Sequence, residues 1–242
     1  MTRSITFENN NLKKYRHLFF DLDHTLWDFE RNTSEAIKEI YDIFELSRWS
    51  FFSFDDFKNE FTEVNSDLWD KFNHGKIERL ELRNERFKMI LEKLGVDVDE
   101  IPKGIGDKYL ELAPIKSHVI PFAHEILEYL KSNYRLHIIS NGFDDVQHTK
   151  LQASKIRDYF EVIVTSDSSG YRKPQKGIFE FAMKSANASK TNSIMIGDNI
   201  DTDIIGAQNA AMDHVFFNPN KHLHNLHVTH EIDSLKQIMN IL

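Results

Sequence analysis

Apolar residues in this chain follow two different patterns. Short, continuous apolar runs at residues 17–22, 135–140, 161–166, 193–197 and 214–217 are typical of buried strands. Between the later runs, apolar residues recur every three or four positions, which predicts helices near residues 123–132, 145–154, 177–186 and 203–210. Apolar strands that alternate with helices favour a parallel sheet covered on both faces. The predicted fold class is therefore α/β.

The segment from residue 33 to 112 shows the helical pattern alone. Asn32 and Glu35 are placed like a capping box at the start of its first helix. We therefore expect an α/β core formed by residues 15–30 and 115–242, interrupted by an all-helical insertion, residues 31–114. The apolar positions of the three expected helices are Ile37, Ile40, Tyr41 and Phe44; Phe57, Phe61, Val64, Leu68 and Phe72; and Leu80, Phe87, Ile90, Leu91 and Leu94, with Gly95 as the stop.

Composition excludes several classes of function. The 30 Lys and Arg against 38 Asp and Glu give a net charge of −8, whereas nucleic-acid binding needs a basic surface. The absence of cysteine excludes disulfides, thiolate metal sites and a cysteine nucleophile. The sequence contains no apolar run of about 18 residues and no recognisable signal peptide. We expect a cytoplasmic protein that binds neither nucleic acid nor membrane.

Chemically reactive side chains gather where the predicted strands end. Asp21 and Asp23 share one face of a strand, about 6.6–6.8 Å apart, so one must be protonated or a cation must lie nearby. Hard oxygen ligands without histidine or cysteine favour Mg²⁺. Each aspartate could instead simply cap a loop or helix. The residues at the strand ends are Asp21, Asp23, Ser140, Asn141, Gly142, Asp198 and Asp203, with Lys173 on a nearby loop.

Four of these segments resemble the motifs of a known superfamily. "DLDHTL" (21–26), "IISNG" (138–142), "RKP" (172–174) and "GDNIDTDIIGA" (197–207) match, in order and spacing, the haloacid dehalogenase-like hydrolases. The resemblance implies a Rossmann-like core, with the helical insertion as its cap. The insertion text "VNSDLWDKFNHGKIERLELRNERF" (64–87) is similar to the pyrimidine 5′-nucleotidase branch.

The resemblance also implies a role for each residue. Asp21 would be the nucleophile that forms an aspartyl-phosphate, and Asp23 the general acid and then the base. Mg²⁺ would be bound by the carboxylates of Asp21 and Asp198 and by the backbone carbonyl of Asp23, in place of the Asp23 side chain that the strand argument suggests. The remaining expected roles are phosphate binding by Ser140, Asn141, Gly142 and Lys173, orientation of Lys173 or a metal-bound water by Asp203, and a backbone hydrogen bond from Thr25 that braces the loop.

Two further groups allow more than one interpretation. In the cap, Trp69 or Phe72 could stack on a base and Asn73 could bind its edge, although the helical spacing of Phe72 favours core packing. His222, His224, His227 and His230 could bind a transition metal, but their segment is more typical of a solvated loop.

The leading interpretation is a Mg²⁺-dependent phosphomonoesterase that acts on nucleoside monophosphates. The first alternative is the same chemistry on a sugar phosphate or another small phosphorylated metabolite. A second is an inactive module that binds a phosphorylated ligand, which the complete set of reactive residues disfavours. Dehalogenases of the superfamily typically lack the second carboxylate of the first motif, so Asp23 argues against that activity.

Overall fold

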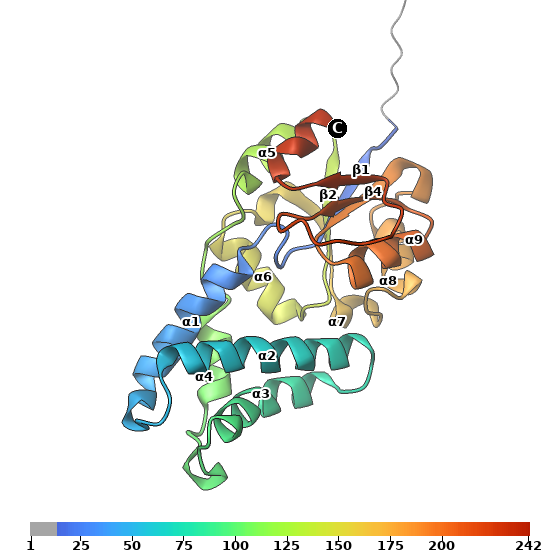
Figure 1. The fold of residues 1–242 in the computed structure, drawn as a ribbon. Coiled ribbons are helices and arrows are strands. Elements are labelled where there is room, and N and C mark those ends of the chain that lie inside the picture. Colours follow the sequence, from blue (N-terminus) through green and yellow to red (C-terminus); the bar gives the residue numbers. More distant parts are fainter. Residues whose placement is uncertain (1–13) are drawn as a thin grey trace, which may run out of the picture.

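The structure is a computed structural model that describes residues 14–242. At its centre lies a six-stranded sheet in the order β3-β2-β1-β4-β5-β6, with each neighbouring pair parallel (Figure 1). This confirms the α/β prediction. The strands are β1 (His17–Phe20), β2 (Arg135–Ile139), β3 (Phe160–Val164), β4 (Ser193–Gly197), β5 (Asp213–Phe217) and β6 (His230–Ile232).

Strand β1 is buried on both faces, which explains its continuous apolar run. Leu18 and Phe20 pack in a core with α5, α6 and the C-terminal turn, whereas Phe19 packs on the opposite face with α8 and α9. The helices around the sheet are α5 (Ala123–Leu130), α6 (Asp144–Ala153), α7 (Ser166–Ser169), α8 (Lys176–Ser185) and α9 (Ile205–Asn209), with 3-10 turns at Arg157–Tyr159, Lys190–Asn192 and Leu235–Asn240.

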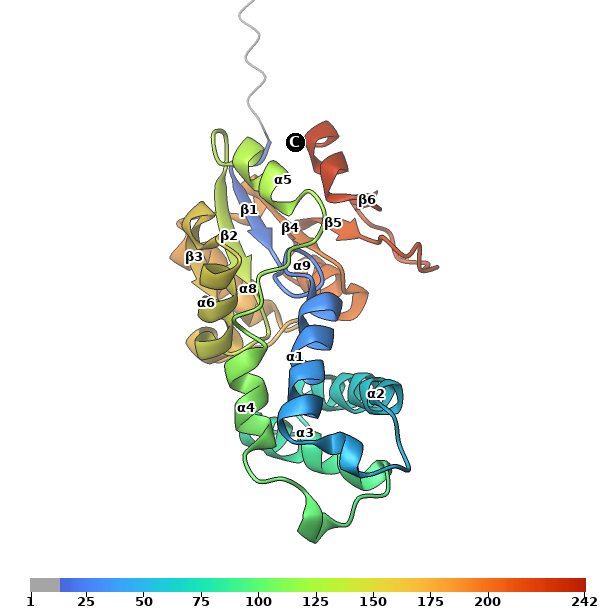
Figure 2. The same ribbon diagram turned by 90° about the vertical axis from the view of Figure 1, so that its left-hand side faces the viewer.

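Helices α1 to α4 form a separate layer beyond the carboxyl ends of the strands (Figures 1 and 2). They have an apolar core of their own, in which Phe57, Phe61 and Phe87 are buried. We call this layer the cap. It consists of α1 (Phe29–Ile43), α2 (Phe54–Asn73), α3 (Arg79–Lys93) and α4 (Ile105–Leu112), with 3-10 turns at Leu46–Arg48 and Val98–Glu100.

The start of the cap differs from the sequence prediction. Helix α1 begins at Phe29, and the Asp28 carboxylate accepts the N-terminal hydrogen bond, so the capping box at Asn32 and Glu35 is wrong. The Asn32 amide instead lies inside the helix and exchanges two hydrogen bonds with the backbone of His118. Asn32 therefore joins the chain segments that enter and leave the cap.

Two segments near the C-terminus also differ from the prediction. The helix expected at 203–210 starts earlier, as a π-helical turn at Ile200–Ile204, because the Asn199 side chain accepts from two backbone N–H groups of that turn. The histidine segment is not all loop: His230 belongs to β6, and His224 packs against Phe216. Within residues 14–242, the clustered metal-ligand groups do not include these histidines, and no helix is long and apolar enough to cross a membrane.

Candidate active site

The register of the three central strands brings their carboxyl ends together. Phe20 of β1 lies between Ile138 of β2 and Ile196 of β4. The Asp21 backbone N–H then donates to the Ile196 carbonyl at 2.9 Å, so the chain leaves β1 still paired with β4. Asp21, Ser140 and Asp198 consequently meet at one edge of the sheet, as sequence reasoning expects of parallel strands.

Lys173 is the buried cation at this edge. Its Nζ donates to Asp21 Oδ1 at 2.5 Å and to the Ile139 carbonyl at 3.0 Å, and it lies 2.7 Å from Asp203 Oδ1. Burial alone would lower the pKa of Lys173, but the carboxylates of Asp203 and Asp21 outweigh it and raise that pKa. Lys173 is therefore charged and binds two acidic residues that are far apart in the sequence.

Asp21, Asp198 and Asp203 form a carboxylate cluster in which one oxygen of each lies within 4.8 Å of the others. Burial raises the pKa of Asp21 well above its usual range; Lys173 opposes this rise, and Asp203 and Asp198 add to it. Burial and Asp203 raise the pKa of Asp198 to about 6. With all three carboxylates ionised, the cluster and the Lys173 ammonium would carry a charge of −2, which a divalent cation would offset. The oxygen donors and this charge therefore fit Mg²⁺.

Two hydrogen bonds orient the acidic cluster. The Thr25 hydroxyl donates to Asp198 Oδ1 at 2.8 Å, rather than to the backbone as predicted. Asp203 Oδ2 accepts from the Asn199 backbone N–H at 3.1 Å. The close packing extends to Gly197, where a Cβ atom would lie 2.3 Å from an Asp203 oxygen. Glycine at this position lets Asp203 approach the end of β4.

Asp23 has its own cation, separate from that of Asp21. Its Oδ1 accepts from Lys150 Nζ at 2.5 Å and its Oδ2 from Gln147 Nε2 at 2.8 Å. Burial would raise the pKa of Asp23, but Lys150 and Gln147 together lower it. The two carboxylates of the first motif therefore differ in their protonation tendencies.

Sequence reasoning missed Lys150 and Gln147. Both lie on α6, three residues apart and hence on one face of the helix that follows the Ser140 strand. Their three-residue spacing on a predicted helix is visible in the sequence, but their burial beside Asp23 is known only from the fold.

The Ser140–Gly142 segment connects the strand end to the Lys173 loop. Ser140 Oγ accepts from Gln147 Nε2 at 2.5 Å and from the Gly142 N–H at 3.1 Å. Asn141 Oδ1 accepts from the Lys173 N–H at 2.7 Å, and its Nδ2 donates to the Lys173 carbonyl. A Cβ atom on Gly142 would lie 2.4 Å from Gln147, so this glycine makes room for the side chain that holds Asp23.

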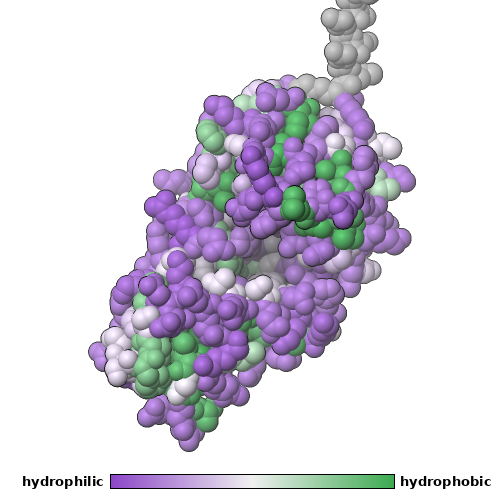
Figure 3. Space-filling model, viewed as in Figure 1, coloured by the Kyte–Doolittle hydropathy of each residue, from purple (hydrophilic) through white to green (hydrophobic). Residues whose placement is uncertain are grey.

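A cavity of about 470 Å³ lies between the core and the cap and is lined by Asp21, Asp23, Lys173 and residues 140–142. Figure 3 shows a hollow between the two parts on this side of the molecule. From the cap, Trp69 lines the cavity and stacks on Phe143, with ring centres 5.6 Å apart. Phe72 is buried in the cap core, and Asn73 Oδ1 accepts from Asn141 Nδ2. Of the three suggested base-binding residues, Trp69 and Asn73 line the cavity and Phe72 does not.

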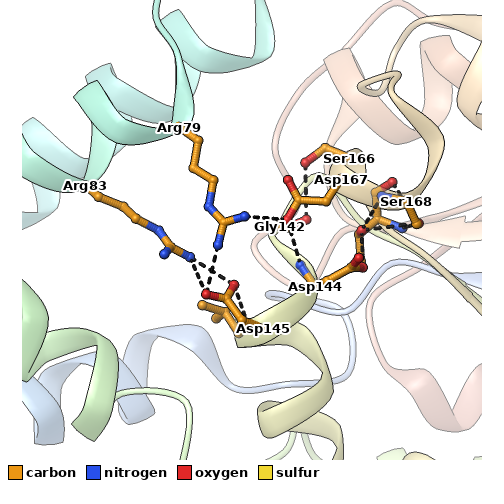
Figure 4. A network of polar contacts seen from close by, with 10 residues as sticks. Arg79, Arg83, Gly142, Asp144, Asp145, Ser166, Asp167 and Ser168 are labelled. Carbon is orange, nitrogen blue, oxygen red and sulfur yellow. Dashed lines mark hydrogen bonds and ion pairs between the residues drawn. The ribbon is translucent and has the colours of Figure 1, made fainter.

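Charged contacts join α3 of the cap to the core (Figure 4). Arg79 donates to Asp167 and Asp145, each at 2.8 Å, and Arg83 donates to both oxygens of Asp145. Asp167 in turn accepts from the Asp144 backbone N–H at the start of α6. The cap therefore contacts the same helix, α6, that carries the partners of Asp23.

A family model of haloacid dehalogenase-like hydrolases matches residues 15–211. The chain belongs to this family. Its resemblance to the family, inferred from the four motifs, is confirmed.

Among haloacid dehalogenase-like hydrolases, the chain is similar to the pyrimidine 5′-nucleotidase YjjG of Escherichia coli K12, with 30% identity over 200 residues covering 82% of this chain and 84% of YjjG. It is 27% identical over 241 residues to a glyceraldehyde 3-phosphate phosphatase of Pyrococcus furiosus, covering 96% and 94% of the two chains. The crystal structure of YfnB from Bacillus subtilis, bound to magnesium, matches with a TM-score of 0.84 and 27% identity over 95% of this chain and 99% of YfnB.

Replacement of Lys173 by methionine is expected to lower the free energy of unfolding by about 3–5 kcal/mol, because buried carboxylates lose their cation. Urea denaturation measures this change. Lys176→Met is the control, since the Lys176–Glu180 pair is exposed and its loss should cost less than about 1 kcal/mol. Equal, small losses in the two variants would contradict the assigned role of Lys173.

Proposed function

We propose that this hydrolase is a Mg²⁺-dependent phosphomonoesterase that removes phosphate from nucleoside monophosphates through an aspartyl-phosphate on Asp21. The observation that carries the proposal is the buried Asp21, which shares Lys173 with Asp203 and opens onto a cavity that also contains Asp23. A nucleophile and a separate proton carrier beside one cavity are what phosphate-ester hydrolysis requires.

The carboxylates of Asp21 and Asp198 and the backbone carbonyl of Asp23 would hold the metal ion. When bound, Mg²⁺ supplies positive charge that offsets the charge of the phosphoryl oxygens and of the acidic cluster. The Asp203 carboxylate keeps Lys173 in place beside Asp21. Lys173 then stabilises charge on the transferring phosphoryl group.

In the first step, an Asp21 oxygen forms a bond to phosphorus as the bond from phosphorus to the leaving oxygen breaks. The Ser140 hydroxyl and the backbone N–H groups of Asn141 and Gly142 bind the phosphoryl oxygens. Asp23 gives its proton to the leaving oxygen, and a dianionic phosphate nearby raises the pKa of Asp23 enough to favour protonation.

In the second step, water attacks the phosphorus bound to Asp21 and releases phosphate. Asp23 takes a proton from that water, a role for which the Lys150 ion pair favours the ionised carboxylate. Asp21 attacks as the ionised carboxylate, and Lys173 favours that form by opposing the rise that burial causes in its pKa.

Two observations support a nucleoside as the leaving group. The cavity contains aromatic surface from Phe61, Trp69, Tyr109 and Phe143, which suits a planar base. The relative YjjG is named a pyrimidine 5′-nucleotidase. The similar phosphatase of Pyrococcus furiosus, named for glyceraldehyde 3-phosphate, supports a small sugar phosphate as the second candidate substrate.

A screen of phosphate esters in the presence of Mg²⁺ tests the substrate. We expect kcat/KM for UMP or dUMP to exceed that for glyceraldehyde 3-phosphate and ribose 5-phosphate, as measured by phosphate release. Equal kcat/KM values for sugar phosphates and nucleotides would contradict the nucleotide assignment but not the phosphatase chemistry.

The Asp21→Asn variant is expected to lose at least about 10³-fold in kcat, because the amide cannot form the phosphoryl ester. Its circular dichroism spectrum should stay native, since Lys173 keeps Asp203 and the Ile139 carbonyl as partners. Asp158→Asn, on an exposed turn of the core, is the matched control and should retain full activity. Near wild-type turnover by pure Asp21→Asn would rule out Asp21 as the nucleophile.

Chelation by EDTA is expected to abolish turnover, and added Mg²⁺ to restore it, because the charge of the acidic cluster would otherwise repel phosphate. In Asp198→Asn, the Mg²⁺ concentration for half-maximal activity should rise by at least about tenfold, for loss of one charged ligand. Magnesium titrations followed by phosphate release measure both effects. Activity that is indifferent to EDTA would contradict the metal assignment.

A further inference from the structure

Two polar side chains in the cap wall of the cavity are buried without hydrogen-bond partners. Asn65 on α2 is 7% exposed and its Oδ1 accepts no hydrogen bond within residues 14–242. Arg86 on α3 is 5% exposed and its Nε donates none to the described chain. Both line the cavity that contains Asp21. Buried polar groups are normally paired, so two unpaired groups on one cavity wall indicate that a ligand pairs them.

Arg86 differs from the arginines that lie between the cap and the core. Arg79 and Arg83 pair with core aspartates, and Arg172 pairs with Glu78. Across residues 14–242, no carboxylate forms an ion pair with Arg86, whose guanidinium lies 5.1 Å from the centre of the Tyr109 ring. A guanidinium can only donate hydrogen bonds, so the group that it lacks is an acceptor.

The surroundings of the two residues are aromatic. Phe61 lies one helical turn before Asn65 on α2, and its ring centre is 5.3 Å from that of Tyr109. Both rings line the cavity. The subsite therefore offers apolar ring surface together with an amide and a donor-only cation.

We infer that Asn65 and Arg86, with Phe61 and Tyr109, bind the nucleobase of the substrate and so select a nucleotide over a sugar phosphate. This inference rests on the proposed function. The polar edge of a base presents acceptors for Arg86 beside N–H donors for the Asn65 oxygen, and its faces are apolar. An anionic group would satisfy Arg86 but place negative charge beside the Asn65 oxygen, and a sugar alone lacks the flat faces.

The inference replaces the residues that the sequence suggested for base recognition. The Asn73 side-chain oxygen already accepts from Asn141, and Phe72 lies in the cap core without lining the cavity, whereas Phe61 and Tyr109 line it. Asn65 and Arg86 line the cavity and have buried polar atoms without partners in residues 14–242.

UMP and ribose 5-phosphate form a matched pair of substrates, because they share the ribose and the 5′-phosphate and differ by the base. We expect Arg86→Met to lower the ratio of their kcat/KM values by about 10–100-fold, and Asn65→Leu by about tenfold. The change should be mainly an increase in KM for UMP, with kcat little affected. Lys88→Met and Asn84→Leu, on the exposed face of α3, are the matched controls and should leave the ratio unchanged.

Thermal melting separates ligand binding from a structural role. Methionine at position 86 removes a buried, unpaired charge, so the melting temperature should stay the same or rise. A lower melting temperature with equal losses on both substrates would identify Arg86 as a structural residue and overturn the inference. An unchanged ratio of the kcat/KM values for UMP and ribose 5-phosphate would overturn it as well. So would a selective loss of activity on 3-phosphoglycerate, an anionic substrate without a base, while activity on UMP is retained.

Binding of UMP to Asp21→Asn, measured by calorimetry, distinguishes failure of the inference from failure of the proposed function. One outcome is that Asp21→Asn binds UMP more tightly than ribose 5-phosphate, and that adding Arg86→Met weakens UMP binding at least tenfold. If the wild-type chain then hydrolyses no UMP, the result would support the subsite and refute the phosphatase. Turnover of UMP with unchanged selectivity in both cap variants would support the phosphatase and refute the subsite.

Discussion

The ion pairs of Lys173 with Asp21 and Asp203 are the interaction on which the site depends. All three side chains are buried, so removal of Lys173 would leave two carboxylates without a cation in a low-dielectric environment, whereas loss of either carboxylate would leave Lys173 paired with the other. The Lys173 backbone is in turn held by both polar ends of the Asn141 amide. A single cation thus couples β1, the 172–174 loop and the segment after β4, and it sets the position of the proposed nucleophile.

A second constraint is the separation of the two carboxylates of the first motif. Asp21 belongs to an acidic cluster that raises its pKa, whereas Lys150 and Gln147 lower the pKa of Asp23. Lys150 also lies 4.4 Å from the centre of the Trp27 ring, which keeps it away from bulk water. Two aspartates that are two positions apart in the sequence therefore have different electrostatic environments.

The cap contributes to the site through its contacts with the core and through its own unpaired groups. Arg79 and Arg83 bind core carboxylates, and Asn73 binds Asn141, so these polar groups fix the cap above the strand ends. Asn65 and Arg86 have no such partners among the described residues. The paired side chains hold the cap against the core, and the unpaired ones are those that we propose to bind the ligand.

The sequence alone determined the α/β fold, the order of its elements and the residues at the strand ends. It could do so because burial on both faces leaves continuous apolar runs, and because parallel strands end at one edge of the sheet. Tertiary structure alone decided which groups pair. Asn32 bonds to His118 instead of capping its helix, Asn73 uses its side-chain oxygen to accept from Asn141, and Lys150 reaches Asp23 from 127 positions away. Such pairings depend on the distances between elements after packing, and no local pattern of residues encodes them.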